Sequence, residues 1–260
     1  MARRPGRFPV TAVARVYLTG EKAYWPKPTL DVSQDIAEVE ARLAEVARKH
    51  ASNVRFTGGE TIRSAEEVQP WLAKMGDIDG VLMIPLMQPT PTLRPLIDAL
   101  SVPGLVFSRP YATHAWSSIA ALQKAGRKLD VLATSSYGDL DPYLRAFRTV
   151  HHLRKSKVLV GAAAPGARQQ TADAYHAHFD TTFQFVTGPE FIDAFRAADS
   201  KLARKAADAF VRGALRVVEP SPEEILNGLR FYLALEEILR REKANTIAID
   251  CFGTLAANTL

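Results

Sequence analysis

The first stretch of this sequence that could do chemistry is a polar and aromatic loop near the N-terminus. Between Gly20 and Leu30 the chain carries Glu21, Lys22, Tyr24 and Trp25. Such a set suits a sugar, because a sugar's apolar face stacks on a ring while its hydroxyls form hydrogen bonds with polar groups. The loop is also longer than a strand-to-helix connection needs to be. We predict that these four residues bind a small molecule; the alternative is that the two aromatics only pack their own loop.

A second polar loop, Ser135 to Asp139, directly follows a predicted strand. In open α/β sheets, ligands bind at the carboxyl ends of the strands. The loop is therefore a candidate ligand-contacting turn. The alternative is that Asp139 or Asp141 only caps the helix that follows.

One cluster has residue types that bind metals: Asp173, His176, His178 and Asp180. On a helix, Asp173, His176 and Asp180 would share one face. The spacing matches no established metal motif, and short polar residues near a helix end are usually solvated. We therefore predict no metal ligand in this chain.

Other catalytic and nucleotide-binding motifs are incomplete. Gly161 and Gly166 are spaced as in a P-loop, but Ala167 and Arg168 stand where Lys and Ser or Thr are required. The sequence contains no G-x-G-x-x-G and no G-x-S-x-G. Cys251 is expected to be buried in an apolar strand end, where a thiol is unreactive.

His151 and His152 lie in a basic segment, Arg145 to Lys157. Cations at the end of a helix complement its dipole, which is the favoured interpretation. An anion or nucleic-acid patch is the alternative.

The composition is that of a globular protein, with 47% hydrophobic and 23% charged residues in 260 residues and a net charge of +5. No apolar run approaches the roughly eighteen residues that span a membrane. The basic N-terminus is not followed by the apolar region of a signal peptide. A single cysteine favours a reducing compartment. We therefore expect a cytoplasmic protein without a membrane partner, and nucleic acid is not an expected partner.

The elements that must position these residues alternate in type. Apolar or β-branched runs predict strands, and helical patterns separate them, which is typical of a doubly wound parallel α/β sheet. We expect a flavodoxin-like strand order in a first domain over residues 1–154. The predicted strands are Thr11–Leu18, Val54–Phe56, Gly80–Pro85, Gly104–Ser108 and Asp130–Thr134, and the predicted helices are Ser33–Lys49, Ser64–Met75 (opened by a capping box), Thr92–Leu100, Ala115–Ala125 and Asp141–Leu153.

A second α/β domain is predicted over residues 155–260. The capping box Ser221-Pro-Glu-Glu224 marks the start of its longest helix. The sequence stops soon after a buried strand that normally needs further neighbours, so this domain is expected to be incomplete. Its predicted strands are Lys157–Gly161, Thr182–Val186 and Thr246–Asp250, and its predicted helices are Ala167–Ala177, Pro189–Ala197, Ser200–Arg212 and a last one running to Lys243.

Several of these segments resemble known sugar isomerases. The stretch VYLTGEKAYW (Val16–Trp25) resembles the first strand and loop of L-arabinose isomerases. The stretch SSYGDL (Ser135–Leu140), followed by a basic helix and KVLVG, resembles the L-fucose isomerase-like family, as does AIDCF (Ala248–Phe252). The order of elements is similar to the two N-terminal α/β domains of that superfamily over essentially the whole chain.

The resemblance implies a metal-dependent aldose–ketose isomerase. Such enzymes typically use Mn²⁺ to polarise the substrate's carbonyl and hydroxyl oxygens while a carboxylate moves a proton between C1 and C2. Their metal ligands lie beyond the segment that resembles AIDCF, so none is assigned here, and this part alone is expected to be inactive.

The resemblance also implies a homo-oligomer, a trimer or hexamer, in which Lys22 or Trp25 acts in a neighbour's site. Lys22 stands where arabinose isomerases have Gln, and Trp25 where they have Tyr. The sugar is therefore left open. Two alternatives also stay open: a sugar-binding α/β module without catalysis, similar to the periplasmic sugar-binding fold, and a basic nucleotide or nucleic-acid binder.

Overall fold

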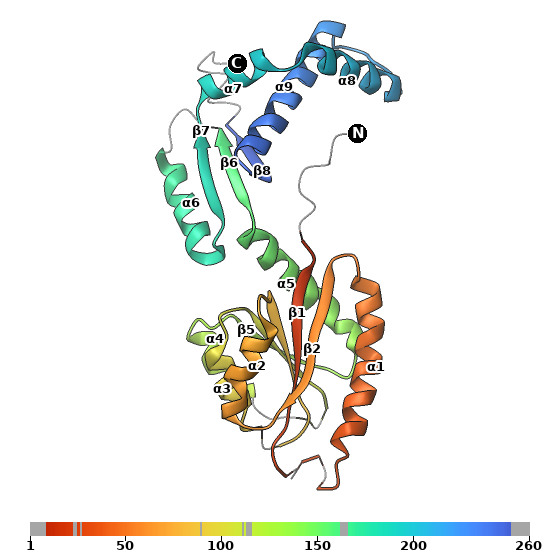
Figure 1. Cartoon of the computed structure of the whole chain (residues 1–260), viewed down its shortest axis with the longest axis vertical. Helices are drawn as coiled ribbons and strands as arrows, with labels where there is room; N and C mark the ends of the chain where they lie inside the picture. Colours follow the sequence, from red (N-terminus) through yellow and green to blue (C-terminus); the bar gives the residue numbers. More distant parts are fainter. Residues whose placement is uncertain are drawn as a thin grey trace. The chain divides into compact units, whose positions relative to one another are not determined.

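A computed structural model describes residues 9–22, 25, 26, 28–88, 90–110, 112, 116–161 and 166–250. Within these residues the chain divides into two compact units (Figure 1). The first unit is Pro9–His151, and the second is made of the described residues from His152 onward. Each unit has its own parallel sheet.

The first unit is built on a five-stranded parallel sheet. Its strand order is β2-β1-β3-β4-β5, which confirms the flavodoxin-like order. In this order the chain moves to one side of β1 to form β2 and then to the other side to form β3, so the direction of winding switches between β1 and β3. The strands are β1 (Thr11–Leu18), β2 (Val54–Ile62), β3 (Gly80–Pro85), β4 (Gly104–Ser108) and β5 (Leu129–Ala133).

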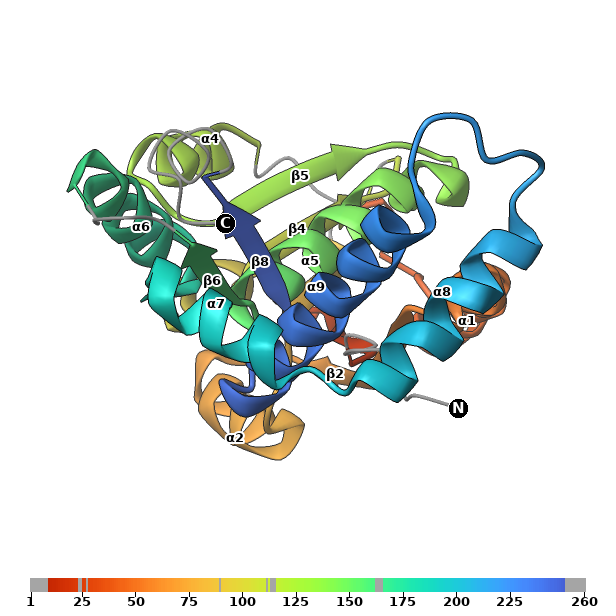
Figure 2. The same cartoon turned by 90° about the horizontal axis from the view of Figure 1, so that it is seen from above.

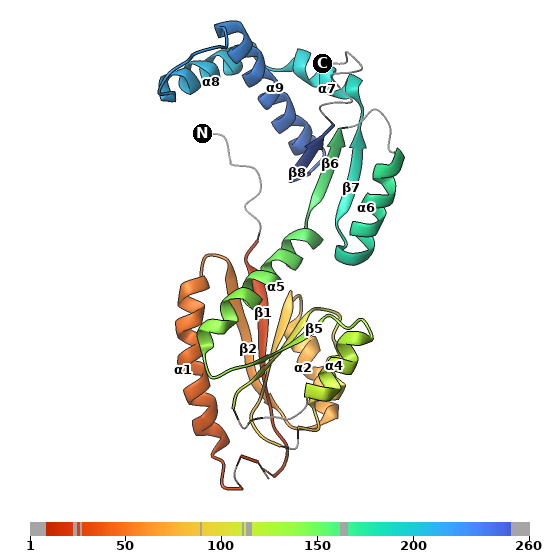
Figure 3. The same ribbon diagram turned by 180° about the vertical axis from the view of Figure 1, so that it is seen from behind.

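Helices cover both faces of this sheet, as Figures 1 and 3 show from opposite sides. Apolar side chains of α1 and α5 form one core cluster with the sheet. Those of α2, α3 and α4 form the other. The helices are α1 (Val32–His50), α2 (Val68–Met75), α3 (Leu93–Ala99), α4 (Trp116–Lys124) and α5 (Asp141–Arg154), with short 3₁₀ turns η1 (Ala65–Glu67) and η2 (Tyr137–Leu140) before α2 and α5. The doubly wound prediction is therefore confirmed.

The second unit has a three-stranded parallel sheet of order β7-β6-β8. Its core joins Leu159 and Val186 of the sheet to Phe191 of α7 and Ile238 of α9. Figure 2 shows α7, α8 and α9 from above. The strands are β6 (Lys157–Gly161), β7 (Thr182–Val186) and β8 (Thr246–Ile249), and the helices are α6 (Gly166–Phe179), α7 (Gly188–Ala197), α8 (Ser200–Gly213) and α9 (Pro222–Arg241).

The two predicted capping boxes have different outcomes. At α9, Glu224 N donates to Ser221 Oγ (3.2 Å) and Ser221 N donates to Glu224 Oε2 (2.6 Å), as predicted. At Ser64 the prediction is wrong, because the segment starts as a 3₁₀ turn and the Ser64 side chain forms no capping hydrogen bond. Glu67 Oε2 accepts from the amide of Arg63 instead (2.8 Å).

Strand β2 is longer than predicted. The short prediction Val54–Phe56 stopped before two glycines that weaken a strand pattern. In the structure they form a bulge where the register with β1 shifts between Arg15 and Val16. Gly58 has a φ of +70°, and a Cβ there would lie 2.6 Å from the carbonyl oxygen of Arg15. Glycine is therefore needed at Gly58, and β2 continues to Ile62.

Candidate functional site

The carboxyl-terminal edge of the five-stranded sheet gathers polar residues from distant parts of the chain. Thr19 follows β1, Arg63 follows β2, Arg109 follows β4 and Thr134 follows β5. Because all five strands run parallel, these residues come to the same edge of the sheet. This edge, next to the switch between β1 and β3, is where open α/β sheets bind ligands.

A cavity of about 580 Å³ lies at this edge, which we call the edge cavity. It is bounded by the loop after β1, the end of β2, the start of α1 and the loop after β3. Its size falls within the range of small-molecule sites, roughly 300–1,000 Å³. The lining residues are Thr19, Gly20, Glu21, Lys22, Pro28, Leu30, Val32, Arg63 and Met87.

The charged groups of the edge cavity are available to a ligand. Glu21, Lys22 and Arg63 are all exposed, and none of them forms an ion pair with another residue of the described chain. Thr19 is 1% exposed, and its Oγ1 has no hydrogen-bond partner among the residues that the structure describes. Its backbone amide donates to Ile62 O (3.2 Å), which joins the ends of β1 and β2.

Trp25 lies in the loop after β1, together with Glu21 and Lys22, but it does not line the edge cavity. The amide of Gln88 donates to the carbonyl oxygen of Trp25 (3.0 Å), in an isolated antiparallel bridge between the loops after β1 and β3. The Trp25 side chain is nevertheless 40% exposed. Of the four predicted ligand-binding residues, Glu21 and Lys22 line the edge cavity, and Trp25 lies further along the same loop and is partly exposed. Tyr24 lies outside the described residues.

An ion pair fixes the start of α1 to the same edge of the sheet. Arg109, directly after β4, donates through Nη1 and Nη2 to both carboxylate oxygens of Asp35 in the first turn of α1, at 2.8 and 2.6 Å. The phenol of Tyr137 lies nearby. Burial raises its pKa, while the charge of Arg109 acts in the opposite direction. Arg109 is far from the predicted Gly20–Leu30 loop in sequence, whereas Asp35 follows that loop closely.

The Ser135–Asp139 loop forms its own hydrogen bonds. Thr134 Oγ1 donates to Asp139 Oδ2 (2.6 Å) and accepts from the amide of Ser136 (3.0 Å). The ring of Tyr137 packs edge-on against Phe107 with centroids 5.0 Å apart. Asp139 therefore serves a local turn before α5.

The candidate metal cluster has other partners. Asp173 accepts from Gln169 Nε2 (2.7 Å), His176 Nδ1 contacts Thr181 O (3.2 Å), and Arg154 lies 3.6 Å from Asp180. Across all described ranges, no group of three His, Cys, Asp or Glu side chains is placed to hold a metal ion. The described residues thus do not form a Mn²⁺ site. Residues 162–165 and Cys251, which bear on the P-loop and thiol predictions, lie outside the described part of the chain.

His151 lies near the end of α5, as the basic-segment interpretation expected, but its side chain is buried against the sheet. It is 4% exposed, and its Nδ1 contacts Asp79 Oδ1, while Asp79 Oδ2 accepts from the amide of Ala12 (2.8 Å). This buried pair anchors α5 to the amino-terminal edge of the sheet. The tertiary structure therefore gives His151 a structural partner that the local sequence did not indicate.

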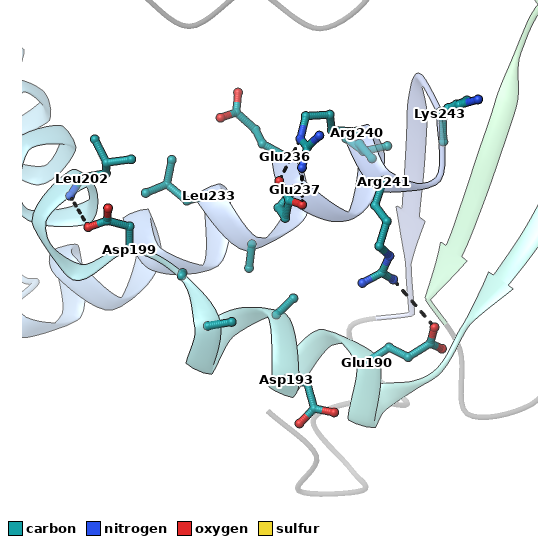
Figure 4. Close-up of a pocket in the computed structure, with 16 residues that line it drawn as sticks. Glu190, Asp193, Asp199, Leu202, Leu233, Glu236, Glu237, Arg240, Arg241 and Lys243 are labelled. Carbon is teal, nitrogen blue, oxygen red and sulfur yellow. Dashed lines mark hydrogen bonds and ion pairs between the residues drawn. The ribbon is translucent and has the colours of Figure 1, made fainter.

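A larger groove, about 1300 Å³, lies on α7 and α9 in the second unit (Figure 4). Most of its charged groups already have partners: Arg240 lies 2.5 Å from Glu237, and Arg241 lies 3.9 Å from Glu190. The carboxylate of Asp199 caps α8 by accepting from the amides of Lys201 and Leu202. We therefore favour the smaller edge cavity, whose charges have no such partners, as the ligand site.

Sequence reasoning missed Thr19, Arg63, Asp35 and Arg109. The rule that polar residues after parallel strands form the site was applied to the fifth strand only. Applied to every strand end, it would have found Thr19 and Arg109, and also Arg63 if the length of β2 had been predicted correctly. Asp35 had no local signal, because its role depends on the distant Arg109.

The fold and site together define an α/β protein with a flavodoxin-like sheet and a cavity with polar and charged lining residues at the carboxyl edge of that sheet. No protein-family model matches the chain, and no curated protein matches it either. In the described residues, no helix has the length and apolar character needed to cross a membrane.

Proposed function

We propose that this chain is the N-terminal, substrate-contacting part of a metal-dependent aldose–ketose isomerase of the fucose and arabinose isomerase type. The proposal rests on the resemblance of the Val16–Trp25, Ser135–Leu140 and Ala248–Phe252 segments to those enzymes. Two successive parallel α/β units are in keeping with it. In this proposal the protein is cytoplasmic and works as a homo-oligomer, a trimer or hexamer.

The observation that carries the proposal is the edge cavity beside an exposed tryptophan. Sugar hydroxyls both donate and accept hydrogen bonds, and the edge cavity offers a carboxylate at Glu21 and donors at Lys22 and Arg63. The exposed ring of Trp25 offers a surface on which the apolar face of a sugar can stack. A sugar would thus be bound by polar groups on one side and by an aromatic ring on another.

The role of these residues is to bind and orient the sugar. A divalent metal, when bound by an isomerase of this type, polarises the substrate's carbonyl. Because the described residues do not form a metal site, we assign no catalytic step to them. Holding a substrate in the correct orientation is itself a large contribution to catalysis.

The second candidate is a sugar-binding α/β module without catalysis. The edge cavity supports this second candidate equally well, because binding and orienting the sugar is the only role that we propose for the cavity residues. The two candidates share the ligand and differ only in whether the ligand reacts.

An isomerisation assay beside a binding assay tests both candidates. The 260-residue chain and any longer product of its reading frame would be given a panel of aldoses with and without Mn²⁺, and ketose formation measured. Binding to the 260-residue chain would be followed by calorimetry. Mn²⁺-dependent ketose formation supports the isomerase, and binding without turnover supports the module. If no aldose binds, or if binding is unchanged by Glu21→Gln combined with Lys22→Met, both candidates are wrong.

A further inference from the structure

We propose that the ligand of the edge cavity carries an anionic group, a phosphate or a carboxylate, which is held by Lys22, Arg63 and the hydroxyl of Thr19. This inference rests on the proposed function in that it concerns the same cavity and specifies the class of sugar. It goes further, because the resemblance to sugar isomerases implies only that the substrate is an aldose.

The first argument is the balance of charge around the edge cavity. Among the described residues that line the cavity, Lys22 and Arg63 contribute two positive charges and Glu21 one negative charge, and none of the others is charged. Neither cation is paired with a carboxylate of the described residues. The two cations come from different elements, the loop after β1 and the end of β2, and meet at one cavity. An anion bound there would gain charge-assisted hydrogen bonds from both.

The second argument is the buried hydroxyl of Thr19. A buried hydroxyl without a partner is unfavourable, because it has lost its water and gained nothing in return. Within the described residues, the hydroxyls of Thr11, Thr57 and Thr92 also lack partners, but only Thr19 lines the edge cavity. An anionic oxygen of a ligand would accept the hydrogen bond that Thr19 can donate.

The third argument is position. Thr19 and Lys22 follow β1, and Met87 follows β3, so the edge cavity lies at the switch between the two strands. Doubly wound sheets bind anionic ligands at this place because the loops diverge there and leave room between them.

Titration with inorganic phosphate and with acetate tests the anion site by itself. Binding to the 260-residue chain would be followed by amide chemical shifts at low ionic strength. We expect Arg63→Ala to weaken phosphate binding by about tenfold or more, as for loss of a charged hydrogen bond. The matched control is Arg55→Ala, which removes an exposed arginine from strand β2 itself, outside the edge cavity. It should change binding less than twofold, so equal losses in both variants would overturn the proposal.

Two threonine variants test whether the hydroxyl of Thr19 binds the anion. Thr19→Val and Thr11→Val each remove an unpartnered buried hydroxyl, at opposite ends of the same strand β1. Thr19→Val should weaken phosphate binding about three- to tenfold and Thr11→Val should leave it unchanged. Equal behaviour of the two variants would remove Thr19 from the proposed anion site.

Comparing sugars separates this inference from the proposed function. Neutral aldoses, aldose phosphates and uronic acids would be titrated into the wild-type chain and Arg63→Ala. Tighter binding of the phosphates or of the acids, lost in Arg63→Ala, supports the inference and identifies the anion. Equal binding of neutral and charged sugars overturns it and leaves the proposed function standing. Phosphate binding that depends on Arg63, without any sugar binding, supports the anion site and contradicts the proposed function.

Discussion

Arg109 and Asp35 form a two-point ion pair, in which both guanidinium Nη atoms donate to the two carboxylate oxygens at 2.6 and 2.8 Å. The side chain of Arg109 is 18% exposed and that of Asp35 is 16% exposed. The two residues are 74 positions apart in the sequence. The pair joins the end of β4 to the first turn of α1, the helix whose Val32 lines the edge cavity. A planar guanidinium matches both oxygens at once, which a lysine does not.

We therefore expect Arg109→Lys to lower the free energy of unfolding of the first unit by about 1–2 kcal/mol, and Arg109→Ala by about 2–3 kcal/mol. Urea unfolding measures the loss, and hydrogen exchange should show faster opening of the first turn of α1. Arg94→Ala is the control, because it removes an exposed pair with Asp98 on α3 and should cost about 0.5 kcal/mol or less. Similar losses in Arg94→Ala and Arg109→Ala would contradict the anchoring role.

The second prediction concerns the stability of the bulge at Gly58. Gly58→Ala places a Cβ 2.6 Å from Arg15 O in a residue with a φ of +70°. We expect a loss of about 1–3 kcal/mol in the free energy of unfolding, since both backbone strain and a clash are added. Gly76→Ala also has a positive φ, +64°, but nothing within 4 Å of the new Cβ, so it measures backbone strain without the clash and should cost less than Gly58→Ala. Equal losses would show that the bulge accommodates the methyl group.

The carboxylate of Asp141 makes the stability of the first unit depend on pH. Lys49 Nζ and His50 Nε2 at the end of α1 both contact it, the latter at 2.8 Å. These hydrogen bonds, that of Lys49 first, hold the pKa of Asp141 below its ordinary value of 3.8. Because the folded-state pKa is the lower one, this stabilisation is complete above about pH 5 and is lost as the pH falls through the folded-state value.

Asp141→Asn should therefore lower the free energy of unfolding at pH 7 by about 0.5–1 kcal/mol, a small loss because Lys49 is largely exposed. Below pH 4 the difference from the wild type should shrink towards zero. Urea unfolding at a series of pH values between about 3 and 7 measures it. A difference between variant and wild type that stays constant over this range would contradict the linkage.

Stacking on Trp25 makes a prediction that is independent of charge. Trp25→Ala should weaken the binding of aldoses by about three- to tenfold, as for the loss of one aromatic contact, and leave inorganic phosphate binding unchanged. Trp71→Phe is the control, because Trp71 is 4% exposed and belongs to the core. Sugar should also shift the tryptophan fluorescence of the wild type but not of Trp25→Phe. A shift that survives in Trp25→Phe would place the sugar elsewhere.

The sequence by itself was sufficient for the fold class and for most elements. Strands β3, β4, β6 and β7 begin and end at the predicted residues, because each is a short apolar run bounded by turn or helix signals. The start of α9 was also predictable, since Ser221 and Glu224 form the capping box from adjacent residues. Such signals are local, so they can be read without knowing the fold.

Only the tertiary structure decided the features that depend on neighbours distant in sequence. Strand β2 extends through Gly58 because β1 pairs with it there, and the backbone of Arg15 leaves no room for a Cβ. His151 is buried because Asp79 meets it from the start of β3.

The candidate site also contains residues that local sequence could predict and residues that only the tertiary structure brings to it. The composition of one loop was enough to predict Glu21 and Lys22, which line the edge cavity. Arg63 joins them, and Arg109 anchors the helix beside them, because the order and direction of the strands bring separate strand ends to one edge. Local sequence determines which residues can form strands, helices and loops. The sheet decides which of their side chains meet, because hydrogen bonds and ion pairs act over a few ångströms in space and take no account of separation along the chain.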